Sequence, residues 1–245
     1  MRSLLVAIGF LTRLPVPASV FGDARTQAQS LAWYPLVGVL LGSLLYVFAW
    51  LLHGLAVPLL LASALLLVAW VGLTGALHLD GLADSADAWV GGLGDRARTL
   101  EIMKDPRCGP VGVVALVSVL LLKFAALATL AASASTAALM LAPVLARTAL
   151  TAAFLSTPYV RRDGLGSALT SAPREACRIA LIVAAVFCLA FGWHGVIALV
   201  VTTIVGYLWR RACIARLGGF TGDTAGALAE IVEVAVLVAL GAAAG

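Results

Sequence analysis

"LAWYPLVGVLLGSLLYVFAWLLHGLAVPLLLASALLLVAWVGLTGAL", residues 31–77, contains no charged side chain. Its two apolar runs, 31–52 and 55–77, are separated only by His53-Gly54, and each is long enough to cross the hydrocarbon core of a bilayer as a helix. The runs lack the period-2 alternation of membrane β-strands. Because only helices and closed barrels satisfy their backbone groups in lipid, the stretch predicts two transmembrane helices joined by a tight turn.

The composition of the whole chain agrees with this prediction. Of the 245 residues, 62% are hydrophobic and only 11% are charged, with a mean hydropathy of +1.08, whereas soluble domains carry about 25% charged residues. These values exclude a water-soluble fold and predict a single all-α integral-membrane domain over residues 1–245. The net charge of +4 is interpreted as a sign of topology and not of nucleic-acid binding. The four cysteines form no CxxC pair and are expected to pack as small apolar residues.

Further apolar runs cover residues 109–131, 136–156, 179–209 and 224–243. The run 179–209 is ambiguous, because one helix of that length would measure ~46 Å, well over the ~30 Å core. Two helices of ~21–24 Å each would be short but tolerable if the bilayer thins. The two-helix interpretation places every polar segment, namely 1–30, 78–108, 157–178 and 210–223, on one side of the membrane.

The basic residues are then concentrated on that side of the membrane. Of the sixteen lysines and arginines, all except Lys123 and Arg147 lie in or beside these segments, while the opposite turns, His53-Gly54, "AASAS" (131–135) and "GWHG" (192–195), contain none. By the positive-inside rule the polar side is cytoplasmic. The sequence therefore predicts about seven spans with a cytoplasmic N-terminus. The segment "LLVAIGFLTRLPVP" (4–17) is too short to span and is expected to lie in the interface.

Three aspartates stand out in "HLDGLADSADAW", residues 78–89. Asp80, Asp84 and Asp87 are spaced i, i+4, i+7, which places them on one face of a helix, and Gly81 permits a close backbone approach. Three like charges repel one another, and a divalent cation would turn that repulsion into a binding site; Mg²⁺ is held by a few carboxylates together with water and substrate phosphates. The alternative is a solvated acidic face.

A second acidic constellation lies in "GGFTGDTAGALAEIVE", residues 218–233. Thr221 is a candidate N-cap, and Asp223, Glu230 and Glu233 lie close to one face of the helix that follows, with Gly226 leaving room beside them. Glutamates in an apolar segment need a cation or a basic partner. One alternative is that the two are structural, paired with Lys123 or Arg147. The predicted topology places the segments 78–108 and 210–227 in the same compartment, as a site for phosphoryl transfer requires.

Basic residues that could bind phosphate occur at three places. Lys104 and Arg107 precede a span in "EIMKDPRCGPVGVVAL" (101–116), Arg147 lies within a span, and Arg161 and Arg162 follow in "PYVRRDGLG". Cations at a helix start oppose the macrodipole, and arginine suits the recognition of pyrophosphate. The alternatives are positive-inside anchoring for the first pair and snorkelling for Arg147.

Four motifs together resemble one family. "FLTRLPVP" (10–17), "HLDGLADSADA" (78–88), "IMKDPRCGPVGVVAL" (102–116) and "LGGFTGDTAGALAEIVE" (217–233) are similar, in this order, to the cobalamin synthase family of membrane-bound adenosylcobinamide-GDP ribazoletransferases. The resemblance covers residues from about 10 to 240. It implies transfer of phosphocobinamide from adenosylcobinamide-GDP to the 5′-hydroxyl of α-ribazole, or of its 5′-phosphate, with release of GMP. It also implies a Mg²⁺ requirement and a bacterial inner-membrane enzyme whose active site faces the cytoplasm.

The residues and the resemblance together give one site hypothesis. Mg²⁺ is expected to bind against the pyrophosphate, and a further set of carboxylates is expected to complete the site or to orient the hydroxyl. Membrane lipid is the surrounding solvent, no nucleic acid is involved, and the oligomeric state stays open, a homo-oligomer included. The assigned residues are Asp80, Asp84 and Asp87 for the metal; Asp84, Asp87, Asp223 and Glu230 for catalysis; and Lys104, Arg107, Arg147 and Arg161 for phosphate.

Two other function classes are weighed against this one. Asp80-Gly81 also opens the motif of the CDP-alcohol phosphatidyltransferases, but their later Gly-x-x-x-Asp-x-x-x-Asp run is matched only at Gly91 and Asp95, with Thr99 in the last place. That family is therefore treated as a chemical analogue. A cation- or proton-coupled transporter would use carboxylates as a relay, yet the chain shows no half-to-half repeat and its acids gather toward one face.

Overall fold

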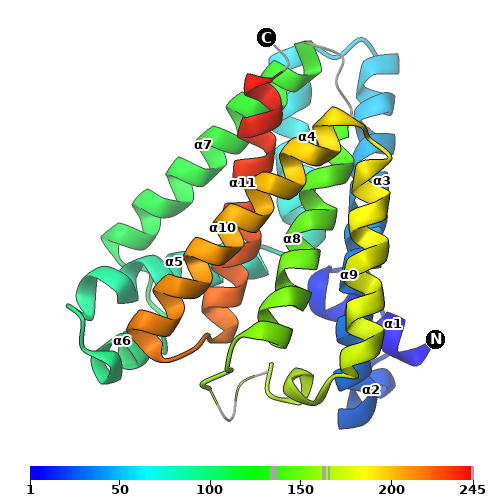
Figure 1. Ribbon diagram of the computed structural model, residues 1–245. Coiled ribbons are helices and arrows are strands. Elements are labelled where there is room, and N and C mark those ends of the chain that lie inside the picture. Colours follow the sequence, from blue (N-terminus) through cyan, green and yellow to red (C-terminus); the bar gives the residue numbers. More distant parts are fainter. Residues whose placement is uncertain (133–136, 162–163, 165, 244–245) are drawn as a thin grey trace.

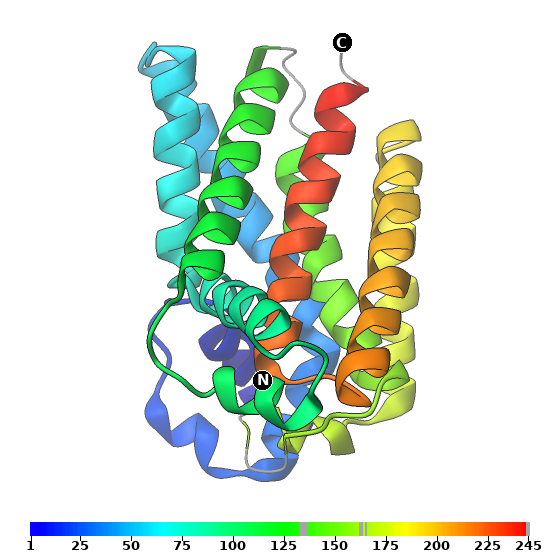
Figure 2. The ribbon, with the colours of Figure 1, turned by 90° about the vertical axis from the view of Figure 1, so that its left-hand side faces the viewer.

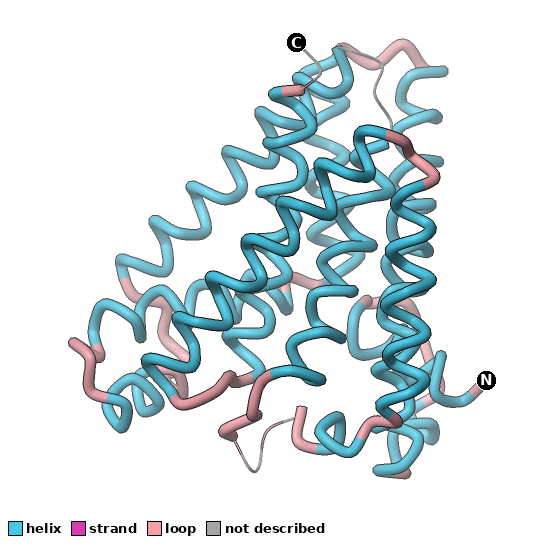
Figure 3. The backbone as a smooth tube through the Cα atoms, in the orientation of Figure 1, coloured by secondary structure: helices cyan, strands magenta, loops and turns pink. Residues whose placement is uncertain are grey.

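The computed structural model describes residues 1–132, 137–161, 164 and 166–243. Helices form nearly all of this part of the chain, with the loops at the two ends of the bundle (Figure 3). The described residues contain no strand, only an isolated bridge between Tyr159 and Phe220. The helices are α1 (Arg2–Leu11), η1 (Ala18–Gly22), α2 (Ala24–Ser30), η2 (Leu31–Trp33), α3 (Tyr34–Gly54), α4 (Leu59–Thr74), α5 (Leu77–Gly91), α6 (Arg96–Ile102), α7 (Pro110–Ala132), α8 (Ala137–Ser156), η3 (Ala168–Ser171), α9 (Arg174–Leu189), α10 (Trp193–Leu217) and α11 (Gly222–Ala242).

The helices α3, α4, α7, α8, α9, α10 and α11 run along the bundle and alternate in direction (Figures 1 and 2). Among the described residues, five helical segments are long and apolar enough to cross a membrane alone, and the bent pair α4–α5 gives a sixth if it is one span. Helix α9, with 16 residues, is shorter. The chain is thus an all-α, multi-pass membrane protein, in agreement with the predicted bundle. Helices α1, α2, α5 and α6 gather at the end opposite the C-terminus (Figure 1).

The ambiguous run 179–209 is divided, as the charge pattern predicted. Helix α9 ends at Leu189 and α10 begins at Trp193. Gly192 between them has a φ of +60°, a conformation that glycine adopts without steric cost. Of the other two predicted turns, His53-Gly54 ends α3, whereas most of 131–135 lies outside the described residues.

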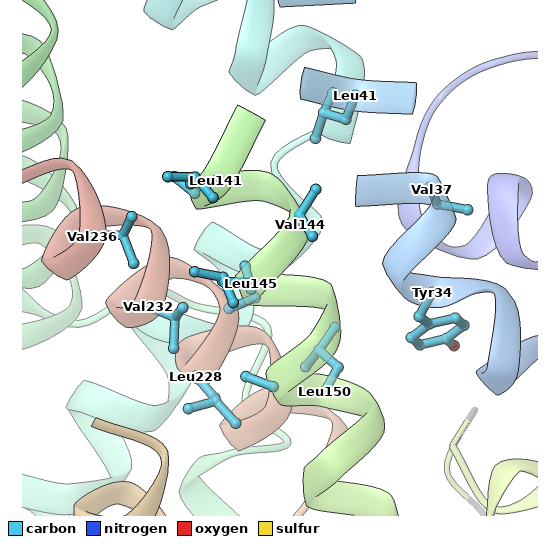
Figure 4. Packing of buried hydrophobic residues seen from close by; sticks show 14 of the residues in the cluster. Tyr34, Val37, Leu41, Leu141, Val144, Leu145, Leu150, Leu228, Val232 and Val236 are labelled. Carbon is cyan, nitrogen blue, oxygen red and sulfur yellow. The ribbon is translucent and has the colours of Figure 1, made fainter. Parts of the chain in front are cut away.

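The core lies where α8 packs between α3 and α11. Gly38 and Gly42 of α3 allow the close approach, since a β-carbon at position 38 would lie 2.6 Å from the Val144 Cα and one at position 42 would lie 2.8 Å from the Leu139 carbonyl oxygen. Small residues that let backbones approach are typical of membrane helix interfaces. The buried side chains shown in Figure 4 include Leu141, Val144, Leu145, Val232 and Val236.

A sharp bend between α4 and α5 positions the first acidic segment. The two helices meet at 88°, because Gly75 and Ala76 both adopt left-handed backbone conformations, with φ of +65° and +57°. Arg13 secures the bend: its backbone N–H donates to the Leu73 carbonyl at 2.7 Å, and its side chain packs where a β-carbon on Gly75 would lie. Helix α5 therefore turns away from the direction of α4 and lies across the end of the bundle (Figure 2).

Candidate active site

The two acidic segments meet where α5 crosses the start of α11. A β-carbon at Gly81 would lie 2.6 Å from the Asp223 carbonyl oxygen, and one at Gly226 would lie 3.2 Å from the His78 Cα. Both glycines thus serve the close approach that the sequence predicted. Thr221 is the N-cap of α11, as predicted, and forms a capping box with Thr224. The crossing brings Asp223 near the aspartates of α5, although more than 130 residues separate them in the sequence.

The surroundings of Asp84 disfavour the charged form of its carboxyl group. Partial burial, followed by the charges of Asp80, Asp223 and Asp87, raises its pKa from 3.8 to about 6, while Arg161 opposes the shift. Among the described residues, neither the Asp80 carboxylate nor the Asp84 carboxylate has a hydrogen-bond or ion-pair partner. The local charge is therefore left uncompensated, which is the condition in which a cation binds.

Asp87 has a different environment. Its carboxylate accepts hydrogen bonds from the backbone N–H groups of Gly109 at 2.7 Å and Gly112 at 2.9 Å. It therefore caps the start of α7 and favours the helix dipole. A β-carbon on either glycine would lie 2.5 Å from an Asp87 oxygen, so both positions require glycine. The structure gives Asp87 a role in holding α7 against α5, with both of its oxygens engaged.

Arg161 is the cation closest to the cluster. Its guanidinium lies 3.0 Å from the Asp223 carboxylate, and it also donates to the Met103 carbonyl at 3.5 Å. The loop before it is fixed to α11, because Val160 donates to the Phe220 carbonyl and Phe220 to the Pro158 carbonyl, each at 2.9 Å. The structure thus brings Arg161 to the site, whereas Arg162 lies outside the described residues.

Arg107 lines a cavity together with Asp84 and Asp87 of α5, and Lys104 lies three residues before it in the chain. Arg107 binds Asp105 through Nε at 2.9 Å and Nη2 at 2.8 Å, and these bonds lower the Asp105 pKa to about 2. The Arg107 side chain is 86% exposed, and Lys104 is exposed as well. A polar cavity of about 290 Å³ lies here, lined by Asp84, Asp87, Ile102, Asp105, Arg107, Cys108 and Gly109.

Arg147 and Glu230 lie elsewhere, in a buried cluster between α7, α8 and α11. Lys123 Nζ lies 2.6 Å from Glu230 and 2.5 Å from Glu233, and Arg147 pairs with Glu233. Arg147 also contacts His78 Nδ1 at 3.4 Å. The four charges balance, and all four side chains are almost fully buried. This placement favours the structural alternative for both residues over roles in phosphate binding and catalysis.

Within the described ranges, no three histidine, cysteine or acidic side chains are placed to hold one metal ion together. The expected set of three α5 aspartates is incomplete because Asp87 binds the α7 amides. Mg²⁺, however, commonly takes only one or two protein carboxylates and completes its shell with water and substrate phosphates. Asp80 and Asp84, one helical turn apart with no partners among the described residues, fit that requirement.

Several residues near the site were not singled out from the sequence. Arg13 supports the bend that aims α5, and its only signal was the motif "FLTRLPVP". Trp70 lies under Lys123, with Nζ 5.1 Å from the ring centroid. Phe154 and Tyr159 form an aromatic wall beside Asp223, with ring centroids 5.7 Å apart. These contacts join segments that are far apart in the sequence, so no local sequence pattern predicts them.

Comparison with known proteins places the chain in a family. The family model described as cobalamin-5-phosphate synthase matches residues 3–241. Proteins named adenosylcobinamide-GDP ribazoletransferase from Stutzerimonas stutzeri (strain A1501) and Pseudomonas aeruginosa (strain PAO1) are each 56% identical over 241 residues, covering 98% of both chains. A relative with the same name from Pseudomonas savastanoi pv. phaseolicola is 53% identical over 237 residues, 96% of this chain and 97% of its own. No solved structure matches. The protein belongs to the cobalamin-5-phosphate synthase family.

Proposed function

We propose that this protein transfers the phosphocobinamide group of adenosylcobinamide-GDP to a ribose hydroxyl of α-ribazole or α-ribazole 5′-phosphate. This hydroxyl is free in both acceptors, and it is therefore not the expected 5′-hydroxyl, whose oxygen already carries the phosphate in α-ribazole 5′-phosphate. The products are adenosylcobalamin, or its 5′-phosphate, and GMP. The names of the relatives support the substrates. The observation that carries the chemistry is the crossing of α5 and α11, which gathers Asp80, Asp84, Asp223 and Arg161 at one end of a membrane bundle.

Mg²⁺ is the proposed cofactor, held by Asp80 and Asp84. Oxygen ligands suit this cation, and burial, followed by the charges of Asp80, Asp223 and Asp87, raises the pKa of Asp84 to about 6. When bound, Mg²⁺ neutralises charge on the donor pyrophosphate. Asp87 is assigned to positioning, because it ties α5 to α7 through two backbone amides.

The remaining side chains supply orientation and proton transfer. The hydroxyl oxygen of the acceptor forms a bond to the phosphorus that carries cobinamide, and the bond from that phosphorus to the oxygen of GMP breaks. The hydroxyl proton passes to Asp223, whose carboxylate Arg161 holds at 3.0 Å. Arg107, which lines the polar cavity with Asp84, and Lys104, three residues before it and exposed, are the proposed contacts to the phosphates of the donor.

The charge distribution supports a site on the cytoplasmic side of a bacterial inner membrane. Lys104 and Arg107 follow α6 in the chain, and Arg161 follows Val160, which is hydrogen-bonded to Phe220 just before α11. Helices α1 and α6 gather at the end of the bundle opposite the C-terminus (Figure 1). All lysines and arginines except Lys123 and Arg147 belong to segments at that end, and basic residues favour the cytoplasmic face.

A direct assay tests the proposal. Purified protein in lipid nanodiscs receives adenosylcobinamide-GDP, α-ribazole and Mg²⁺, and GMP release is followed by chromatography. The expected result is GMP in a 1:1 ratio with the cobalamin product, dependent on both substrates and on the metal. Release no faster than with heat-inactivated protein would disprove the function.

A further inference from the structure

A second cavity, of about 210 Å³, shares no lining residue with the polar cavity near Arg107. Asp80, Asp223 and Arg161 line one part of it, while Phe154 and Tyr159 line another. The remaining wall comes mostly from apolar side chains of α1, α3, α8 and η3, including Leu11, Leu150 and Leu169. A mostly apolar cavity with a few convergent polar groups is the usual form of a small-molecule site.

Taking the proposed function as given, we infer that this cavity binds the acceptor nucleoside, with its aromatic base against Phe154 and Tyr159 and its reacting ribose hydroxyl at Asp223. Aromatic side chains bind flat bases through their faces, with little dependence on which base is bound. Below the ~300 Å³ of typical ligand pockets, the cavity suits one bicyclic base and its sugar, but not a corrinoid.

Guanine, the base of the donor, fits this cavity poorly. Its edge carries hydrogen-bond donors and acceptors, and burying these groups without partners is costly. The leucines and phenylalanines of the cavity offer none, and its polar side chains are those of Tyr34, His78, Asp80, Tyr159, Arg161 and Asp223. The benzimidazole base of α-ribazole has no such donor edge, so the apolar part of the wall favours it over guanine.

The position of the two cavities fits a transfer between them. Asp80 lines the apolar cavity and Asp84 the polar one, and residues four apart on a helix are separated by ~6 Å along its axis. An acceptor hydroxyl at Asp223 and a pyrophosphate at Asp84 would therefore be bound at neighbouring carboxylates, and reaction requires them to approach to ~3–3.5 Å. Tyr159 keeps a fixed position relative to Asp223, because its backbone forms a bridge with Phe220, which lies three residues before Asp223.

Gly222 offers a way to test the inference by steric block. It lines the cavity, and a β-carbon there would meet only the Tyr159 hydroxyl, at 3.6 Å. Gly222→Leu therefore fills the cavity with little disturbance of the packing. Gly72→Leu is the matched control, because a β-carbon at position 72 meets no atom within 4 Å and the residue is exposed on α4.

Binding is measured by isothermal titration with α-ribazole alone and, separately, with adenosylcobinamide-GDP and Mg²⁺. For Gly222→Leu we expect the Kd for α-ribazole to rise at least tenfold and that for the donor to change less than twofold, while Gly72→Leu leaves both unchanged. An unchanged Kd for α-ribazole, or equal losses for both substrates, would overturn the assignment.

Two further variants keep the test independent of that one substitution and of the reaction. Tyr159→Ala is expected to weaken α-ribazole binding about tenfold, whereas Tyr159→Phe retains the ring and the affinity; equal affinities in the two variants contradict the proposal. If wild-type protein binds α-ribazole in this pattern but releases no GMP, the binding site stands and the proposed function fails. If GMP is released and the binding pattern is absent, the function stands and the site assignment fails.

Discussion

Gly81 of α5 lies directly against the backbone of Asp223 in α11, so that a β-carbon at position 81 would be 2.6 Å from the Asp223 carbonyl oxygen. This contact joins the two acidic segments of the site. Gly81→Ala should therefore force α5 and α11 apart and reduce kcat by about 100-fold, because a displacement near 1 Å has this effect on aligned groups. GMP release measures the loss. Gly72→Ala, in open space on α4, should keep full activity, and comparable activity in the two variants would contradict the role of the contact.

Asp84 should control the response to pH and to magnesium. Its pKa of about 6, above the ordinary 3.8, means that between these values the folded protein binds a proton that the unfolded chain releases. Without Mg²⁺, the free energy of unfolding should accordingly fall as pH rises through this window. Magnesium affinity should instead weaken below about pH 6, as protons compete for the carboxylate. Calorimetric titrations from pH 5 to 8 measure both effects.

Asp84→Asn should separate stability from activity. The substitution removes a repelled charge, so without Mg²⁺ the melting temperature at pH 7 should rise, while activity should fall at least ~100-fold through loss of charge stabilisation at the reacting phosphate. The exposed Glu101 of α6 provides the matched control, and Glu101→Gln should change neither. Full activity and unchanged Mg²⁺ dependence in Asp84→Asn would rule out the metal assignment.

Asp87 should behave as a helix cap. Asp87→Ala leaves two amides of α7 without an acceptor and should lower the free energy of unfolding by about 0.5–2 kcal/mol. Gly112→Ala, whose β-carbon would lie 2.5 Å from an Asp87 oxygen, should have a similar effect on thermal unfolding. Asp87→Asn keeps one acceptor oxygen and should retain Mg²⁺ affinity within about threefold. A loss as large as that of Asp84→Asn would instead make Asp87 a metal ligand.

The buried charged residues should stabilise the fold only as ion pairs, and not as single residues. Lys123→Met leaves the two glutamates with one cation, and breaking a buried ion pair costs about 3–5 kcal/mol. Lys123→Met combined with Glu230→Leu restores the balance, because Arg147 and Glu233 still pair. The double variant should regain most of the melting temperature in detergent. It should also retain activity, since Glu230 is assigned a structural role; a stable but inactive double variant would restore it to the catalytic site.

The helices and their order could be predicted from the sequence because lipid leaves the backbone few choices. The break between α9 and α10 followed from charge alone, with Gly192 at the predicted turn. The face shared by Asp80 and Asp84 followed from helical periodicity. The helix boundaries and the shared face depend on the composition and spacing of residues within single segments, and both can be taken directly from the sequence.

The partners of individual charges could not be predicted in this way. Asp87 was assigned to metal with its neighbours, yet the amides that it binds lie 22 and 25 residues further along the chain. Glu230 was predicted to be catalytic, with a structural pair as the alternative, and only the position of α7 brings Lys123 within 2.6 Å of it. Spacing defines which side chains share a face, but helix packing decides what that face meets.

The buried cluster also has a consequence for how the chain enters the membrane. Lys123 and Arg147 belong to α7 and α8, while both glutamates that neutralise them belong to α11. Synthesis from the N-terminus therefore produces two lone cations first, each costing ~2.5–3.5 kcal/mol at the centre of an isolated helix. We expect α7 and α8 to remain in or beside the translocon until α11 has been synthesised and can pair with them. Chains ending before Gly222 should then be degraded rapidly in pulse–chase experiments, and Lys123→Leu combined with Arg147→Leu should prolong their lifetime.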